Sequence, residues 1–290
     1  MAVYLRPERL AEALRLLAAP EPPLVLAGGT DLYPMRAAAS AWMAPDRRPL
    51  LDISALPGLQ AIEDRSDHHR IGALVTWAAL RDAPLPSCFD ALRAAAAQVG
   101  GAQVQNRGTV LGNLCNASPA ADGAPPLLAL DAAVELASLR GTRQVPLADF
   151  LLGNRRTALA SDELAVALLV PKASAGARSG FLKLGARRYL VISIVMVAGV
   201  LEAEGGRVAR ARLAVRACSA AARRLPALEE RLHGAPLDAG LAEVVRKEHL
   251  APLSPIDDLR GAAAYRTEAV LVLLRRLLAQ LAAPAMECAA

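Results

Sequence analysis

Short apolar runs alternate with helical patterns of apolar residues over the first 56 residues. After Pro7, leucines recur at helical spacing over residues 10–17, which predicts an amphipathic helix that ends before Pro20. The other elements expected here are a buried strand at 24–27, a helix at 32–39 and a strand at 50–53. Pro57 and Gly58 then mark a turn that closes this first unit.

Strand patterns dominate the next stretch and return after a small-residue linker. The expected strands are 61–63, 69–74, 132–137, 143–146, 163–171, 179–185, 192–202 and 208–215. The expected helices are 76–82, 89–99, 225–232, 237–248 and 262–283. The linker begins at Lys172, so we predict a first domain at 1–172, with subdomains of about 1–56 and 57–172, and a second at 173–290.

Composition and charge narrow the class of protein. Of the 290 residues, 54% are hydrophobic but only 3% aromatic, so the core must consist mainly of Ala, Leu and Val. The longest nearly uninterrupted apolar stretch, 189–201, is too short to span a bilayer, and charges near the start disfavour a signal peptide, so we expect a cytoplasmic protein. The 33 basic residues are interleaved with 28 acidic ones, which disfavours nucleic-acid binding.

Several common sites are absent from the sequence. No two glycines have the spacing G-x-G and no Gly precedes a Lys, which excludes the Rossmann fingerprint and the Walker A loop. The four cysteines are far apart, and we interpret His68 and His69 as parts of a polar turn, so no metal site is predicted. No acid–base constellation stands out either, and we predict no catalytic residue in this chain.

Two polar, glycine-containing segments are the candidate binding loops. The first comprises Ala27, Gly28, Gly29, Thr30, Asp31 and Leu32, and the second, at 108–122, includes Thr109, Gly112, Asn113, Asn116, Ala117, Ser118 and Asp122. Glycines let the backbone approach a ligand, and free amides at a helix start suit a phosphate. The alternatives are a capped strand-to-helix turn and a long loop that satisfies its own backbone. From these residues alone, a dinucleotide site and ordinary loops remain equally open.

Four motifs, in order along almost the whole chain, resemble one family. They are the segments 27–32, 106–122, Phe181 to Arg188, and Asp258 to Arg266. The chain resembles the FAD-binding medium subunit of the xanthine dehydrogenase and carbon monoxide dehydrogenase family of molybdenum hydroxylases. The second motif is long and specific, whereas each of the others would be weak alone.

The resemblance implies a fold, a cofactor and partners. The fold would be α+β, with an FAD-binding domain of the p-cresol methylhydroxylase type, built from two α+β subdomains, and a C-terminal domain with a three-stranded antiparallel sheet and helices. The chain would carry FAD and pass electrons from the [2Fe–2S] clusters of a small subunit to an acceptor such as NAD. A large subunit would hold molybdopterin, and we expect a dimer of heterotrimers.

The resemblance also implies roles for individual residues. Positions 28–31 would contact the FAD pyrophosphate, the second loop would line the cofactor site, and Lys183 would lie near the flavin ring, where a cation stabilises reduced, anionic flavin. Taken alone, Lys183 is more typical of a strand residue that faces water, and Cys115 could be a small apolar filler or a redox group. Many relatives carry Asp where this chain has Val191, which leaves the electron acceptor open.

Two other functions remain as alternatives. An autonomous FAD-dependent oxidoreductase could use the same fold, but it would need its own substrate cavity and an acid or base. A cofactor-free scaffold subunit would tolerate substitutions at Gly29 or Asn113.

Overall fold

Two compact units make up the chain. The computed structural model describes residues 3–41, 46–187 and 190–283. Unit 1 comprises Met1–Ala83, Ala96–Ala121 and Asp131–Lys172, and unit 2 comprises Pro84–Ala95, Asp122–Leu130 and Ala173–Ala290. Two short segments from the first half of the chain therefore pack with the second half, an arrangement that contiguous domain ranges do not express.

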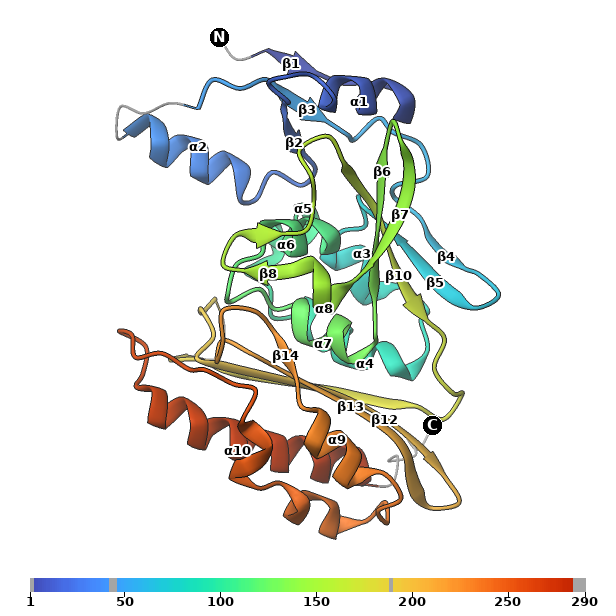
Figure 1. Ribbon diagram of the computed structural model, residues 1–290, viewed down its shortest axis with the longest axis vertical. Helices are drawn as coiled ribbons and strands as arrows, with labels where there is room; N and C mark the ends of the chain where they lie inside the picture. Colours follow the sequence, from blue (N-terminus) through green and yellow to red (C-terminus); the bar gives the residue numbers. More distant parts are fainter. Residues whose placement is uncertain (1–2, 42–45, 188–189, 284–290) are drawn as a thin grey trace. The chain divides into compact units, whose positions relative to one another are not determined.

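Unit 1 begins with a three-stranded parallel sheet. Its strands are β1 (Tyr4–Leu5), β3 (Leu50–Asp52) and β2 (Leu24–Leu26), in that spatial order. Helices α1 (Leu10–Leu17) and α2 (Leu32–Ala41) form the crossovers that parallel strands require (Figure 1). The predicted order of helix, strand, helix and strand is confirmed, and β1 is an additional strand.

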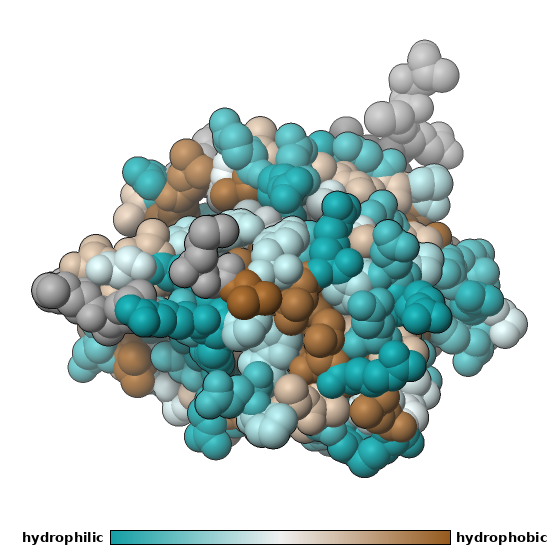
Figure 2. Space-filling view, turned by 90° about the horizontal axis from the view of Figure 1, so that it is seen from above, coloured by the Kyte–Doolittle hydropathy of each residue, from teal (hydrophilic) through white to brown (hydrophobic). Residues whose placement is uncertain are grey.

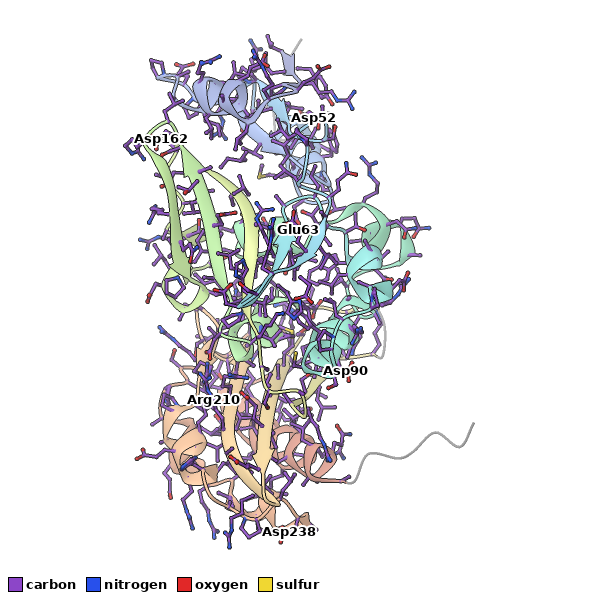
Figure 3. The ribbon with its side chains drawn as sticks, turned by 90° about the vertical axis from the view of Figure 1, so that its right-hand side faces the viewer. Asp52, Glu63, Asp90, Asp162, Arg210 and Asp238 are labelled. Atoms are coloured by element: carbon purple, nitrogen blue, oxygen red, sulfur yellow. The ribbon has the colours of Figure 1, made fainter. Side chains whose placement is uncertain are left out.

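The end of β3 is tied to the N-terminal strand by Asp52, which Figure 3 labels. This carboxylate is 6% exposed and accepts hydrogen bonds from the Ser54 amide, at 2.9 Å, and from the Tyr4 hydroxyl. The guanidinium of Arg6 lies 3.6 Å away. Together these contacts satisfy a buried charge, as burial demands, and they fix the chain where it leaves the sheet.

A five-stranded antiparallel sheet forms the second layer of unit 1. Its strands, in spatial order, are β4 (Ile62–Asp64), β5 (His68–Gly72), β10 (Leu164–Pro171), β6 (Ala133–Ser138) and β7 (Gly141–Pro146). The central strand β10 is buried at every residue except Pro171, which explains its uninterrupted apolar sequence. The remaining elements of unit 1 are α3 (Trp77–Asp82), α5 (Ala102–Arg107), α6 (Val110–Asn116), α8 (Leu147–Phe150), β8 (Leu151–Gly153) and β9 (Arg156–Thr157).

The interpretation of His68 and His69 as a polar turn is wrong. Both belong to strand β5, and pairing with β10 leaves His69 only 7% exposed. Burial lowers the pKa of His69, although Asp64 lies 3.5 Å away. No group of three or more metal-ligating side chains occurs among the residues that the structure describes.

Unit 2 is built on an antiparallel sheet that is buried on both faces. Its strands are β11 (Arg178–Leu184), β12 (Val195–Glu204), β13 (Arg207–Arg216) and the two-residue β14 (Arg223–Arg224). The three predicted strands are confirmed, and β14 is an addition. The helical elements are η1 (Ser87–Phe89), α4 (Asp90–Ala96), α7 (Ala124–Ala129), α9 (Pro226–Leu232), η2 (Ala239–Val244), η3 (Lys247–Leu250) and α10 (Ala263–Ala282).

Strand β12 contributes buried apolar side chains to both faces of the sheet, so other elements must pack on both faces. Val195 and Val197 belong to the core that α10 completes, whereas Met196 and Ala198 pack with residues of α4 on the opposite face. Helix α7, every residue of which is buried, also contacts β12 and β13. The two segments taken from the first half of the chain therefore supply helices that the second half lacks on this face.

Two further details distinguish the structure from the expected elements. The helix expected at 237–248 is wrong, because the 3₁₀ segments η2 and η3 stand there, separated by Val245 in extended conformation. Buried Arg266 donates to the carbonyls of Ile194 and Ala217 at 2.6 and 2.9 Å and to Asp258 at 2.7 Å. The Asp258–Arg266 motif thus anchors the start of α10 to the sheet. None of the helices among the described residues has both the length and the apolar character that crossing a bilayer requires.

Two paired glycines allow α10 to pack closely against the sheet. Gly180 and Gly199 are partners in the β11–β12 register, and a Cβ added to either would lie 2.7 Å from a leucine methyl group, of Leu277 and Leu213 respectively. We predict that Gly199→Val overpacks this contact and lowers the free energy of unfolding by about 1–3 kcal/mol. Urea unfolding followed by circular dichroism measures the change.

Gly176→Ala is the matched control, because its Cβ would meet no atom within 4 Å. Equal unfolding midpoints for Gly199→Val and the control would contradict the packing argument.

Candidate functional site

The first binding loop follows β2, and at Gly28 its backbone lies directly against the backbone of the segment before the second loop. A Cβ at Gly28 would lie 2.0 Å from the carbonyl oxygen of Arg107 and 2.9 Å from the Cα of Gly108. Gly29 has φ +76°, a conformation that glycine adopts without strain. Within the described residues, the amides of Gly28, Gly29 and Thr30 donate to no protein acceptor. The loop therefore needs its glycines for shape and offers amides to a ligand.

The second segment is not a continuous loop as expected. Residues Val110–Asn116 form helix α6, and Thr109 caps it by accepting a hydrogen bond from the Gly112 amide at 3.1 Å. A Cβ at Gly112 would lie 2.6 Å from the Thr109 hydroxyl, so the cap and the glycine depend on each other. The helix ends at Ala117, which has the left-handed φ of 47°. The sequence analysis did not predict this helix, because Gly and Asn are unfavourable in helix interiors.

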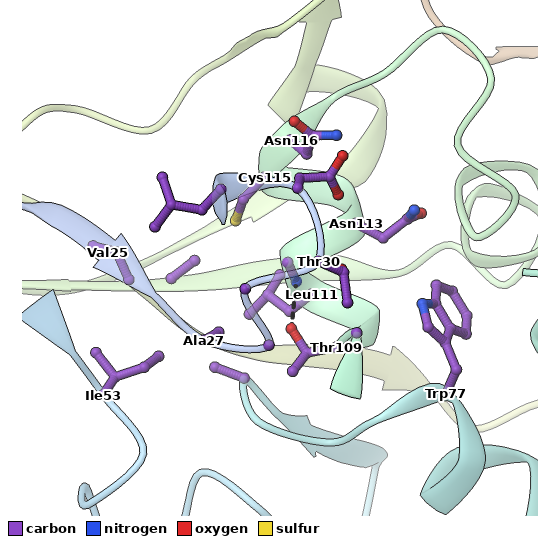
Figure 4. A pocket seen from close by; sticks show the side chains of 18 of the residues that line it. Val25, Ala27, Thr30, Ile53, Trp77, Thr109, Leu111, Asn113, Cys115 and Asn116 are labelled. Carbon is purple, nitrogen blue, oxygen red and sulfur yellow. Dashed lines mark hydrogen bonds between the residues drawn. The ribbon is translucent and has the colours of Figure 1, made fainter. Parts of the chain in front are cut away.

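Both segments line one cavity of about 300 Å³ within unit 1. Ten predicted site residues meet there: Ala27, Gly28, Gly29, Thr30, Asp31, Leu32, Thr109, Gly112, Asn113 and Asn116. In Figure 4, Asn113, Cys115 and Asn116 extend from α6 close to the loop that carries Thr30. A second cavity, of about 330 Å³, shares Ala27, Gly28 and Thr109 with the first.

The cavity also has apolar walls that the sequence reading did not assign to the site. They include Val25, Met35, Ile53, Trp77, Val99, Val104, Leu111, Leu159, Leu164 and Ala165. Val25 and Met35 are 37% and 44% exposed. On the face of the molecule seen in Figure 2, apolar residues lie among hydrophilic ones. These wall residues come from separate elements, so no local pattern could have identified them. Trp77, expected to pack, is 1% exposed and also lines the cavity.

The cavity offers an anion backbone groups but no basic side chain. Among the described residues that line it, none is Lys, Arg or His. Glu163 is paired with Arg143, whose nitrogens lie 2.6 and 2.8 Å from the carboxylate oxygens, and this pairing lowers the pKa of Glu163. Amides of the glycine loop and the partial positive charge at a helix start are the groups that bind a phosphate under these conditions.

Cys115 lies in the wall of the cavity as a neutral thiol. Burial raises its pKa to about 12. A thiol without thiolate character is a poor nucleophile and a poor redox group. The structure therefore favours the interpretation of Cys115 as a small filler.

The other four predicted site residues do not line this cavity. Ala117 is fully buried, and the Ser118 hydroxyl accepts a hydrogen bond from the Ala120 amide at 3.3 Å within its own turn. Asp122 and Lys183 belong to unit 2 and pair with each other at 2.8 Å. Lys183 is thus not a solvent-facing strand residue: its side chain is 5% exposed. Arg188, the last residue of the third motif, lies outside the described residues.

Asn116 has a defined partner next to the cavity. Its side-chain oxygen accepts a hydrogen bond from Arg155 at 2.8 Å, and the Arg155 amide donates to the carbonyl of Ala117. Arg155 lies in the turn between β8 and β9 and has a positive φ of 51°. Sequence offered no signal for this contact, because the two residues are 39 positions apart.

Comparison with known proteins identifies two family regions. Residues 1–173 match the FAD binding domain in molybdopterin dehydrogenase, and residues 181–281 match the CO dehydrogenase flavoprotein C-terminal domain. The segments 84–95 and 122–130 belong to the first match by sequence and to unit 2 by packing. The mixed α+β fold class is confirmed by these matches.

Individual relatives agree over nearly the full length. The nicotine 6-hydroxylase medium subunit of Paenarthrobacter nicotinovorans is 31% identical, with 96% of each chain covered. The xanthine dehydrogenase FAD-binding subunit of Escherichia coli O157:H7 is 30% identical over 98% of this chain and 97% of its own. A chain of reconstituted CO dehydrogenase from Oligotropha carboxidovorans superposes with a TM-score of 0.88 at 27% identity, covering 97% of this chain and 98% of that one. The chain therefore belongs to the family of FAD-binding medium subunits of molybdenum hydroxylases, which includes those of xanthine and carbon monoxide dehydrogenases.

Proposed function

We propose that the chain holds FAD with its diphosphate at the glycine loop of unit 1 and serves as the electron-transfer subunit of a molybdenum hydroxylase complex. The observation that carries this proposal is the backbone contact between the two loops, which leaves the amides of Gly28, Gly29 and Thr30 beside a cavity with both polar and apolar walls. When bound, FAD supplies the redox chemistry. The residues of the chain bind it, orient it and exclude water from the cavity.

The residues present fit a dinucleotide in three respects. The glycine loop cannot hold a side chain at position 28, so the backbone itself forms the floor of the site. Asn113 and Thr30 add polar side chains at the cavity wall, and the apolar walls suit a ring system. Two acids line the cavity: Glu163, already neutralised by Arg143, and Asp31, which is exposed on the first loop.

For Lys183, family resemblance alone supports a place near the flavin ring. The geometry of unit 2 supports its pairing with Asp122 and goes no further. The roles of Ala117, Ser118 and Asp122 as direct cofactor contacts likewise stay predictions.

Partners and electron flow form the outer part of the proposal. We infer an iron–sulfur small subunit that delivers electrons and a molybdopterin large subunit that hydroxylates the substrate, with NAD or another acceptor receiving the electrons. Several relatives are named as medium chains or subunits of a hydroxylase or of dehydrogenases, which supports this arrangement. Val191, where many relatives have Asp, keeps the acceptor open. The cytoplasmic location also stays a prediction.

The cofactor proposal predicts about one FAD per chain, released on denaturation and identified by chromatography. Gly28→Ala should lower the bound FAD at least tenfold, because the new methyl group collides with the Arg107 carbonyl and separates the loops. The visible spectrum of the purified protein measures the FAD content. Gly153→Ala, whose Cβ would meet no atom within 4 Å, is the control. Full FAD content in Gly28→Ala would contradict this geometry, and a colourless wild-type protein that takes up no FAD would favour a scaffold.

Cys115 should stay unreactive in the folded chain. With a pKa of about 12, its thiolate fraction at pH 8 is roughly a thousandfold below that of an ordinary cysteine. Alkylation by iodoacetamide should accelerate about tenfold for each pH unit up to this pKa, because only the thiolate reacts. Peptide mapping measures the rate, with the urea-unfolded chain as reference. Equal rates at pH 8 in both states would contradict this prediction, because Cys115 would then react like an ordinary exposed thiol.

Co-expression with the expected partners tests the assembly. Native mass spectrometry should detect a dimer of heterotrimers that contains this chain, the iron–sulfur subunit and the molybdopterin subunit. Turnover of an organic substrate by the isolated, FAD-loaded chain would instead support an autonomous oxidoreductase.

A further inference from the structure

A buried ion pair in unit 2 joins two residues that the cavity leaves out. The Lys183 Nζ lies 2.8 Å from Oδ1 of Asp122, and the two side chains are 5% and 11% exposed. The Ser193 hydroxyl donates to the same oxygen at 3.4 Å. A buried ammonium is costly unless a counter-charge and hydrogen bonds compensate it. The position of the lysine head group therefore depends on Asp122.

Each member of this cluster is fixed by its own segment. Lys183 lies in β11, where its register partner is Met196 of β12. Asp122 leads into the fully buried α7, and the residue after Ser193 donates its amide to the Leu184 carbonyl at 2.8 Å. Three segments converge on one carboxylate, so the flexible lysine side chain ends at a defined point.

We propose that Asp122 is a positioning residue, which together with Ser193 holds the Lys183 ammonium in one place and acts through Lys183. A lysine has several rotatable bonds and a strongly hydrated head group, and without a fixed partner it would turn towards water. The point at which its positive charge acts is thus set by Asp122. The proposal rests on the proposed function only for the group that Lys183 serves, the bound flavin.

The three lysines of the chain make a direct test possible. Lys172, Lys183 and Lys247 can be followed separately by acetylation with a water-soluble N-hydroxysuccinimide ester and peptide mass spectrometry of the full chain. In the wild-type chain, Lys183 should react slowly compared with Lys172, whose side chain is 39% exposed. Asp122→Asn keeps the side-chain size but removes the charge, and acetylation of Lys183 relative to Lys172 should rise at least tenfold. Asp122→Glu should retain much of the protection.

A matched control separates positioning from loss of stability. Gly199→Val loosens the same unit without touching the pair, and it is compared with Asp122→Asn at equal stability, adjusted with urea. A rise in Lys183 acetylation that is equal in both variants would overturn the proposal, as would a change of less than twofold in Asp122→Asn.

The flavin provides the second readout in the intact complex. Asp122→Asn and Lys183→Gln should both move the flavin midpoint potential to more negative values, and the double variant should equal Lys183→Gln alone, because Asp122 acts through the lysine. Additive shifts would overturn the proposal. A changed acetylation pattern with an unchanged potential in both single variants would support the positioning role and contradict the place of Lys183 near the flavin.

Discussion

The rest of the site depends on one contact in which no side chain takes part. Gly28 lies against the Arg107 carbonyl and the Gly108 Cα, closer than any Cβ would allow. The same second segment is bonded on its other side, where the Trp77 amide donates to the Gly108 carbonyl and the Val110 amide to that of Val75. Three backbone segments, at Gly28, at 107–110 and at 75–77, therefore pack side by side. The cavity walls, the cap at Thr109 and the free amides of the first loop depend on this packing.

The two units treat charge in different ways. Among the described residues, the lining of the first cavity of unit 1 includes backbone amides without a protein acceptor but no Lys, Arg or His, so this cavity suits an anion through fixed dipoles, which need no reorganisation on binding. Unit 2 instead buries a lysine, and burial raises the pKa of its partner Asp122 while the Lys183 ammonium opposes that rise. The loop amides and the Lys183 ammonium are both held in place before a ligand binds. Such pre-organised groups suit a subunit that adjusts the properties of a cofactor and performs no acid–base catalysis itself.

The domain boundary predicted at Lys172 differs from the division of the structure into two packed units for a physical reason. Strand β12 carries apolar residues on both faces of the sheet, and the segment after Lys172 supplies α9 and α10 to one of these faces. Helices α4 and α7, which precede Lys172 in sequence, contribute to the cover of the remaining strand residues. The second family region therefore needs two segments of the first for a closed core, and expressing it alone would expose Met196 and Ala198.

The sequence by itself determined most of the longer strands, several amphipathic helices and ten residues of the cavity wall, because these depend on local periodicity and on glycine-rich segments next to strands. The sequence predicted a strand from residue 69 but not the burial of His69, and it did not predict α6, because pairing with a distant strand and a helix cap that depends on Gly112 leave no local pattern. Only the tertiary structure decided that Arg155 bonds Asn116, that Arg143 neutralises Glu163 and that Asp122 holds Lys183. Those pairings join residues far apart in the chain. The sequence shows that a side chain is charged or polar, but it does not show which distant side chain will lie next to it in the folded protein.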